Sequence, residues 1–533
     1  MIFILIALIS FKTALFCDFN IDLIKPKLEK EIEKSIKAWD VPGIGIAIVH
    51  KDKIVYENYY GVEKKGTNKK YSKNTLQGIH SSTKAFTSVI LMMLVKEGRI
   101  SLEDKVIKYI PDFKLNNEEL TNNFRIIDIL IHNSGIPNFA LDSVWALGFS
   151  SAEMLNKINL ISPENKKGEK YGYQNIFYGV IGMIIEKITG KPYHQVLKEK
   201  LLMPLNMNDS TADEDYVKKL QSNSIISKVK NFFSKNKLSV SFPHTNDWNK
   251  IDKKFQSTPF DHYHHIFEFP STSGVHTTLK DLCKFSMFFI KNGAPILAKK
   301  HFNDLVTERI NVPLKESTQQ FPKFRFKSLK YCFGLFSGKY GENMEKTYII
   351  SGGTSGARSL IGILPDKNIA IVIISNLGGQ SINKCPEEIQ YAFYDMVLNI
   401  NYFNYRNHIY KKSKKFYEKM YKNLNKDRLI SPNSHKNLHY YEGIYENKLY
   451  GKIHIKKLND ILNIRHEKKY SWEVSHWNKD IFTTKSSKVT PHLSAAIPAI
   501  HQFFNFSKSG KAENLWINIF SEGDDGIFNR VSD

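Results

Sequence analysis

The stretch of sequence that decides the fold is residues 78–98, Gly78-Ile-His-Ser-Ser-Thr-Lys-Ala-Phe-Thr-Ser-Val-Ile-Leu-Met-Met-Leu-Val-Lys-Glu-Gly98. From Lys84 onward, its apolar residues recur at the spacing of a mostly buried helix, which Gly98 ends. Ser81 and Lys84 are three residues apart in the first turn, so the helix places both side chains on one face. The stretch therefore predicts a buried helix that begins with a serine–lysine pair.

The chemistry of this pair depends on its position at the start of a helix. A serine there gains from the positive end of the helix dipole, which favours developing negative charge. A lysine one turn later, among apolar neighbours, has its charged form disfavoured and can act as a base. Ser-x-x-Lys is the pattern of serine acyl-transfer enzymes. A helix N-cap serine followed by a solvated lysine satisfies the same pattern, so the assignment depends on the rest of the chain.

Length and composition indicate a globular protein with more than one domain. The chain has 533 residues, of which 42% are hydrophobic and 13% aromatic, enough for a packed core and inconsistent with a disordered protein. The net charge is +23, but the lysines are scattered and no recognisable nucleic-acid motif accompanies the densest basic stretch, residues 406–436. We therefore predict a solvated surface or linker there, and no nucleic-acid partner. Weak contact with a polyanion or an anionic membrane surface is the alternative.

The N-terminus and the cysteines bear on localisation. Residues 1–11 are almost wholly apolar, too few to span a membrane but typical of a signal-peptide core. Cleavage after Cys17 predicts a secreted protein, and a membrane anchor formed by the uncleaved segment is the alternative. The other cysteines are Cys283, Cys332 and Cys385, an odd number without the close spacing of a disulfide scaffold or a zinc site. A single disulfide among them is compatible with secretion.

The pattern along the chain predicts four parts: a signal peptide at 1–17, a large mixed domain at 18–400, a basic linker at 401–436 and a small β domain at 437–533. The large domain reads as a helix at 22–38, strands at 44–49 and 54–60, a helix at 279–290, and strands at 348–351, 359–364 and 369–375. Residues 213–260 are polar and weakly patterned, as in a surface insertion. Short alternating runs after Tyr440 predict a small antiparallel barrel or sandwich.

Several further stretches occur in a fixed order together with the serine helix. They are Trp39–Gly43, Ser81–Thr87, Gly98–Val106, Ile129–Pro137, the Tyr-x-Asn stretch Tyr173–Asn175, Tyr178–Tyr193, Pro204–Ser210 and Ser271–Val275. This ordered set resembles the serine beta-lactamase-like family of the peptidase S12 type, which includes class C beta-lactamases, D-alanyl-D-alanine carboxypeptidases and related esterases. The resemblance covers roughly residues 30–400.

The resemblance implies an α/β (α+β) fold in which helices flank an antiparallel sheet. An all-helical region would lie beside the sheet, with the site between the two. Residues 436–533, which contain Tyr440-Tyr-Glu-Gly-Ile-Tyr-Glu-Asn-Lys-Leu-Tyr-Gly451, resemble the lipocalin-like β domain that follows some members.

An acyl transfer needs a nucleophile, a group that takes its proton, and donors for the oxyanion. By resemblance, Ser81 is the nucleophile, and Lys84, with or without the phenol of Tyr173, takes and relays the proton. Asn175 would hold Lys84 or a substrate amide by hydrogen bonds. The backbone N–H groups of Ser81 and Gly353 would form the oxyanion hole.

One position departs from the family pattern. The third motif of the family is Lys-Thr-Gly or His-x-Gly, and the matching residues here are Ile350, Ser351 and Gly352, followed by Gly353. Ser351, Gly352 and Gly353 are the predicted oxyanion and substrate-binding stretch. Ile350 replaces the cationic or imidazole group, which argues against beta-lactamase or carboxypeptidase activity more than against esterase or amidase activity. Arg358 either supplies the missing charge or points into solvent.

The sequence thus predicts a serine hydrolase that acts through an acyl-enzyme on a small amide, peptide or ester, without a cofactor or a metal. The run His262-Tyr-His-His265 invites a metal assignment, but a polar loop is the better interpretation because convincing further ligands are lacking. The alternative functions are a catalytically weak or inactive scaffold of the same fold, and a polyanion binder. The sequence leaves the oligomeric state open.

Overall fold

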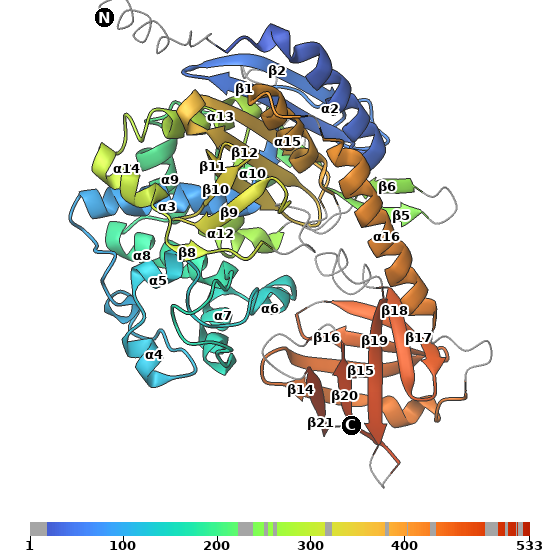
Figure 1. Cartoon of the computed structure of the whole chain (residues 1–533). Helices are drawn as coiled ribbons and strands as arrows, with labels where there is room; N and C mark the ends of the chain where they lie inside the picture. Colours follow the sequence, from blue (N-terminus) through green and yellow to red (C-terminus); the bar gives the residue numbers. More distant parts are fainter. Residues whose placement is uncertain are drawn as a thin grey trace, which may run out of the picture.

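The computed structural model describes residues 19–221, 238–249, 254–259, 264–314, 322–378, 383–401, 403–426, 433–468, 470–485, 499–506, 510–518, 520 and 526–532. The predicted signal segment 1–17 and His262 lie outside these residues. The chain forms a large α/β body and a smaller barrel. One long helix joins the two (Figure 1).

An antiparallel sheet of eight strands forms the centre of the large body, in the order β2-β1-β13-β12-β11-β10-β9-β8. The strands are β1 Gly43–His50, β2 Lys53–Gly61, β8 Ile310–Asn311, β9 Phe326–Tyr331, β10 Phe336–Tyr340, β11 Glu345–Gly353, β12 Arg358–Leu364 and β13 Ile369–Ser375. Both faces of the central strands are covered, and successive side chains of a strand enter opposite layers. In β13, Ile371 and Ile373 belong to one core and Val372 and Ile374 to the other.

Helices cover the two faces of this sheet. On one face lie α2 Lys25–Trp39, α15 Cys385–Val397 and the start of α16 Tyr405–Lys426. On the other face lie α3 Thr83–Lys96 and α13 Leu279–Ile290, where Phe86 stacks on Phe285 with ring centroids 3.8 Å apart. Helix α3 is apolar on nearly all sides because it lies between the sheet and a second group of helices.

That second group forms the helical region predicted from the resemblance. Its members are α4 Glu118–Asn122, α5 Ile126–Leu130, α6 Asp142–Ala146, α7 Ser151–Lys157, α8 Asn175–Thr189 and α9 Tyr193–Leu197. The other helices of the described residues are α10 Glu214–Gln221, α12 Pro270–Ser273 and α14 Lys299–Val306. Short helical turns are η1 Ile21–Leu23, η2 His80–Ser82, η3 Val106–Lys108, η4 Ile158–Leu160, η5 Lys198–Leu202, η6 His264–Phe267, η7 Pro365–Lys367 and η8 Leu438–Tyr441. Small sheets are made by β3 Thr75–Gly78, β4 Ser239–Val240 and β7 His276–Thr277, and by β5 His244–Asn249 with β6 Lys254–Pro259.

The C-terminal strands close into a barrel, as the alternating pattern after Tyr440 predicted. They are β14 Gly443–Asn447, β15 Gly451–Leu458, β16 Ile461–His466, β17 Ser471–Asn478, β18 Ile481–Lys485, β19 Ala499–Phe506, β20 Ala512–Ile517 and β21 Ile527–Ser532. Most of the predicted basic linker is the helix α16, which runs from the sheet to the barrel (Figure 1). The predicted fold class, with its separate small β domain, is confirmed.

Several details differ from the sequence predictions. Helix α8 begins at Asn175 rather than Tyr178, so it starts at a predicted site residue. Strands β8, β9 and β10 were not predicted, and part of the predicted insertion forms α10 and the strands β4 to β6. Cys283, Cys332 and Cys385 are all free and buried, so no disulfide joins any two of them. Within the described ranges, helices lack the combined length and apolarity that a membrane span requires.

Candidate active site

The turn at residues 79–82, called the nucleophile turn below because it contains the predicted nucleophile Ser81, is held against the central sheet by short polar contacts. Ser359 of β12 donates from its Oγ to the carbonyl oxygen of Ile79 at 2.7 Å, and its Oγ lies 2.8 Å from Ser82 Oγ. Ser81 lies between Ile79 and Ser82, in the turn that leads into α3. The fold therefore fixes the backbone of Ser81 through neighbours that are far away in the sequence.

The Lys84 ammonium group lies in the centre of the candidate site. Its Nζ is 3.1 Å from Ser81 Oγ, 2.8 Å from Asn175 Oδ1 and 3.4 Å from the carbonyl oxygen of Thr272. The residue is 1% exposed. Burial lowers the pKa of Lys84 to about 7, against the opposing charge of Asp142. A large fraction of Lys84 is therefore neutral near pH 7, as a general base requires.

Tyr173 differs from Lys84 in that its protonated form is the favoured one. Burial raises the pKa of its phenol far above the usual value, although a hydrogen bond with Ser81 opposes the shift. Its ring centroid is 5.0 Å from Lys84 Nζ. Because the phenol keeps its proton at neutral pH and Lys84 is largely neutral there, these states favour Lys84 over Tyr173 as the acceptor of the Ser81 proton. Both roles stay predictions.

Asn175 connects Lys84 to an acidic residue that sequence reasoning missed. Its side-chain oxygen accepts from Lys84, and its Nδ2 donates to Asp142 Oδ2 at 2.7 Å. Asp142 is the first residue of the short helix α6. An acidic residue in a first helical turn is common, so nothing in the sequence distinguished Asp142.

His132 lies beside Tyr173, with ring centroids 4.5 Å apart. The backbone N–H of Gln174 donates to its Nδ1 at 3.1 Å, so the ring proton is on Nε2, which faces the Tyr331 hydroxyl at 3.3 Å. Burial, and secondarily the charge of Lys84, holds the pKa of His132 well below its usual value. His132 is therefore a neutral imidazole that holds the Tyr173 loop in place.

The predicted oxyanion stretch lies beside the nucleophile turn. A Cβ on Gly352 would be 1.9 Å from the Ile79 carbonyl oxygen and 2.6 Å from the Ser82 nitrogen, so only glycine allows β11 to approach this closely. Ser351 is half-buried on the same strand, and Gly353 ends it. The roles of the Ser81 and Gly353 N–H groups as oxyanion donors stay predictions.

Ile350 and Arg358 do not supply a charge at this strand. Ile350 is fully buried in the apolar core between the sheet and α3, opposite Ile361 of β12. Arg358 takes neither of its two predicted positions, because it is 3% exposed and forms an ion pair with Glu387 of α15. Helix α15 covers the sheet face opposite α3. Neither Ile350 nor Arg358 therefore supplies the cation that the family pattern places at position 350.

The burial of Ile350 makes a specific prediction about its reversion. Ile350→Lys is expected to reduce the free energy of unfolding by about 3 kcal/mol or more, because it buries an unpaired ammonium in an apolar core. Urea denaturation measures the change. The control for lost packing is Ile350→Val, which is expected to reduce the free energy of unfolding by about 0.5–1.5 kcal/mol. A lysine variant as stable as the parent would mean that this position opens onto the site.

Comparisons with known proteins agree with this geometry. The family model described as Beta-lactamase matches residues 28–390, which is more than half of the chain. The Protein flp of Staphylococcus aureus strain MW2 is 31% identical over 187 residues, 35% of this chain and 38% of that protein. The N-acetylmuramyl-L-alanine amidase of Bacillus subtilis strain 168 is 30% identical over 200 residues, 34% of this chain and 44% of that protein. The chain thus matches less than half the length of these relatives.

Solved structures with similar folds include the octameric penicillin-binding protein homologue from Pyrococcus abyssi. It aligns with a TM-score of 0.57 and 22% identity over 92% of this chain and 97% of that one. A class C beta-lactamase aligns with a TM-score of 0.53 and 18% identity over 73% of this chain and 99% of that one. At these identities the likeness concerns the fold. The match to the family model, which covers more than half of the chain, shows that the chain belongs to the beta-lactamase family.

Proposed function

We propose that the protein is a serine hydrolase that forms an acyl-enzyme on Ser81 with a small amide, peptide or ester. The observation that carries the proposal is the buried Lys84, whose Nζ is 3.1 Å from Ser81 Oγ and whose pKa is lowered to about 7. A buried amine that is neutral at physiological pH can accept the proton of a neighbouring hydroxyl nucleophile.

The groups present account for each proton in the reaction. Neutral Lys84 takes the Ser81 proton as Oγ bonds to the substrate carbonyl carbon and the carbonyl π electrons move to oxygen. As the tetrahedral intermediate collapses, the bond to the leaving group breaks. Its nitrogen or oxygen takes a proton from Tyr173, which is replenished from Lys84. Water then attacks the acyl carbon while neutral Lys84 accepts a proton from it. The bond from the acyl carbon to Ser81 Oγ breaks, Oγ takes the proton back from Lys84, and the acid leaves.

The environment of the site supports a restricted class of substrate. With Ile350 buried and Arg358 paired with Glu387, neither of these two residues offers a free cation to a substrate carboxylate. A neutral ester or amide is therefore the favoured substrate, and a peptide with a free C-terminal carboxylate near the reacting bond is disfavoured.

The test is the intact mass of purified residues 18–533 after brief exposure to activated esters and to a penicillin. We expect an adduct of one acyl group with an activated ester, and none with Ser81→Ala, because the variant lacks the hydroxyl that forms the bond. Ser82→Ala is the matched control. In this variant Ser359 Oγ can still donate to the Ile79 carbonyl oxygen and hold the turn, so Ser81 should still be acylated. Equal labelling of the parent and Ser81→Ala would contradict the assignment.

A second candidate is a catalytically weak or inactive scaffold, and the observation that favours it is Ile350 at the position of the family's cation. In that case, well-folded parent protein would show no adduct with any acyl donor.

We also propose that residues 1–17 direct secretion and that the C-terminal barrel is lipocalin-like, in keeping with the closed eight-stranded arrangement. N-terminal sequencing of the mature protein tests the first of these two points.

A further inference from the structure

The residue that holds Asn175 belongs to a segment that reaches from the candidate site to the barrel. This segment, residues 142–157, contains α6, a short connection and α7, and is called the α6–α7 segment below. At its start, Asp142 accepts a hydrogen bond from Asn175. Helix α6 has only five residues, too few to be stable by itself, so its position depends on contacts with other parts of the fold.

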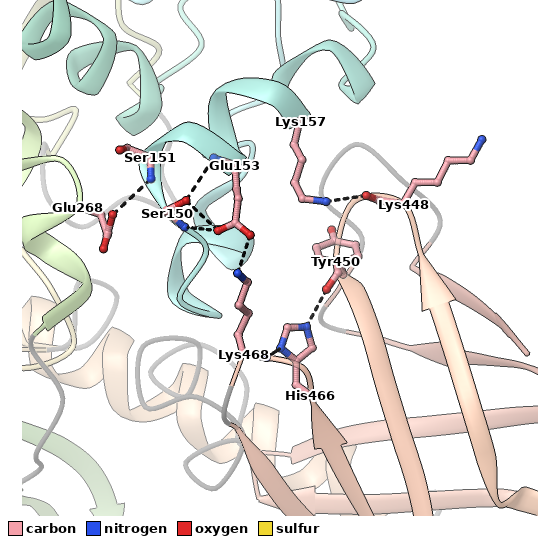
Figure 2. A network of polar contacts seen from close by, with 9 residues as sticks. All are labelled: Ser150, Ser151, Glu153, Lys157, Glu268, Lys448, Tyr450, His466 and Lys468. Atoms are coloured by element: carbon pink, nitrogen blue, oxygen red, sulfur yellow. Dashed lines mark hydrogen bonds and ion pairs between the residues drawn. The ribbon is translucent and has the colours of Figure 1, made fainter. Parts of the chain in front are cut away.

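The other end of the α6–α7 segment is bound to the barrel (Figure 2). Lys468, just after β16, donates from Nζ to Glu153 Oε1 at 2.5 Å. Lys157 donates from Nζ to the carbonyl oxygen of Lys448, just after β14, at 2.7 Å. Burial opposes the ionised form of Glu153, but its hydrogen bonds with Lys468 and Ser150 lower its pKa to about 2. The ion pair therefore persists throughout the physiological pH range.

An aromatic side chain adds to this junction. Phe149 is 2% exposed, and the ammonium groups of Lys157 and Lys468 each lie 5.0 Å from its ring centroid. The ring centroid of His466 lies 5.9 Å from that of Phe149. A Cβ on Gly451 would be 3.1 Å from Phe149 Cζ, so the barrel backbone packs directly on this ring. The junction therefore combines an ion pair with close packing.

The α6–α7 segment also contacts the turn that binds Lys84. The Ser151 backbone N–H donates to Glu268 Oε2 at 3.3 Å, and the rings of Trp145 and Phe269 are 6.0 Å apart. Phe269 immediately precedes α12, which contains the Thr272 carbonyl beside Lys84 Nζ. One short segment thus lies between the barrel and two of the groups that contact Lys84.

We propose that the barrel is a positioning domain of the hydrolase site: it holds the α6–α7 segment so that Asp142 keeps Asn175 on Lys84. Asp142 is accordingly a positioning residue that acts through Asn175. This inference rests on the proposed function of Ser81 and Lys84. It assigns the C-terminal domain a role in proton transfer, independent of any ligand of its own.

The test compares charge reversal at two barrel lysines of similar exposure, in the full chain. Lys468→Glu places a like charge against Glu153. Lys457→Glu disrupts a pair with Asp460 in the same barrel, away from the junction; the two lysine side chains are 28% and 27% exposed. We expect Lys468→Glu to slow Ser81 acylation roughly threefold to tenfold and Lys457→Glu to have no effect. High salt should partly restore the rate of Lys468→Glu by screening the repulsion.

The pH profile separates positioning from general destabilisation. The Asp142 carboxylate raises the pKa of Lys84, so Asp142→Asn lowers it further and shifts the acid limb of the acylation rate to lower pH. Lys468→Glu is expected to shift the limb in the same direction. In the Asp142→Asn background, Lys468→Glu should then have little further effect. Three results would overturn the proposal. They are an acid limb that stays in place in Lys468→Glu, additive effects of Asp142→Asn and Lys468→Glu on the acylation rate, or equal losses of that rate in Lys468→Glu and Lys457→Glu.

Amide hydrogen exchange of residues 139–157 gives a readout that does not depend on catalysis. We expect faster exchange in Lys468→Glu than in the parent and in Lys457→Glu. Should the parent fail to acylate, the proposed function fails, while loss of protection in Lys468→Glu alone still supports anchoring by the barrel. Unchanged protection in Lys468→Glu would contradict it.

Discussion

Lys84→Met is expected to slow acylation of Ser81 by about 10²–10⁴-fold, the usual contribution of a general base. Methionine fills a similar volume in this fully buried position but cannot accept the Ser81 proton. For the parent, the rate should rise about tenfold per pH unit below pH 7 and level off above it, because the neutral lysine is the active form and its pKa is about 7. Stopped-flow acylation with an activated ester between pH 5 and 9 measures both effects.

The same substitution should raise stability. Burial lowers the pKa of Lys84 from 10.5 to about 7, so the folded state disfavours the ammonium form that the unfolded chain retains. The cost to stability is full below pH 7 and disappears as the pH approaches 10.5. Lys84→Met should therefore unfold at a higher urea concentration than the parent at pH 6, with a smaller difference at pH 10.

Lys96→Met is the control for both measurements, since Lys96 lies in the last turn of the same helix and binds only a backbone carbonyl in the described structure. It should leave the acylation rate unchanged. A Lys84→Met variant that is both slower and less stable at pH 6 would indicate that Lys84 acts as a structural cation, contrary to the proposed base.

Gly352→Ala is the second change with a large expected effect. Its Cβ would lie 1.9 Å from the Ile79 carbonyl oxygen and 2.6 Å from the Ser82 nitrogen, both backbone atoms of the nucleophile turn. The turn must move away from β11, so we expect a loss of about 1–3 kcal/mol in the free energy of unfolding. A displacement of this size at the nucleophile should also slow acylation about 10²-fold.

The matched control is Gly338→Ala in β10 of the same sheet. There the new Cβ would meet side-chain atoms of Phe326, with the nearest at 3.1 Å, and these can adjust more readily than backbone. Urea denaturation and acylation kinetics on both variants decide the point. Equal behaviour of the two variants would mean that the close approach of β11 to the nucleophile turn is not required for activity.

Local patterns in the sequence predicted much of the fold. The spacing of Ser81 and Lys84 fixes their common face because a helical turn depends on near neighbours alone. The helix at 279–290 matches α13, and the strands at 359–364 and 369–375 match β12 and β13 closely, since continuous buried runs carry strong signals. The strands β8, β9 and β10 were missed, because short or mixed sequences become strands only through pairing with neighbours.

For the candidate site too, some features were predictable from the sequence and others were not. The sequence by itself determined which residue types are present and in which order, and hence the pairing of Ser81 with Lys84 and the resemblance that pointed to Tyr173 and Asn175. Only the tertiary structure decided that Lys84 is buried and therefore has a lowered pKa, that Arg358 is paired with Glu387, and that Asp142 holds Asn175. Burial and contacts between distant segments arise when the chain folds, and no local pattern encodes them.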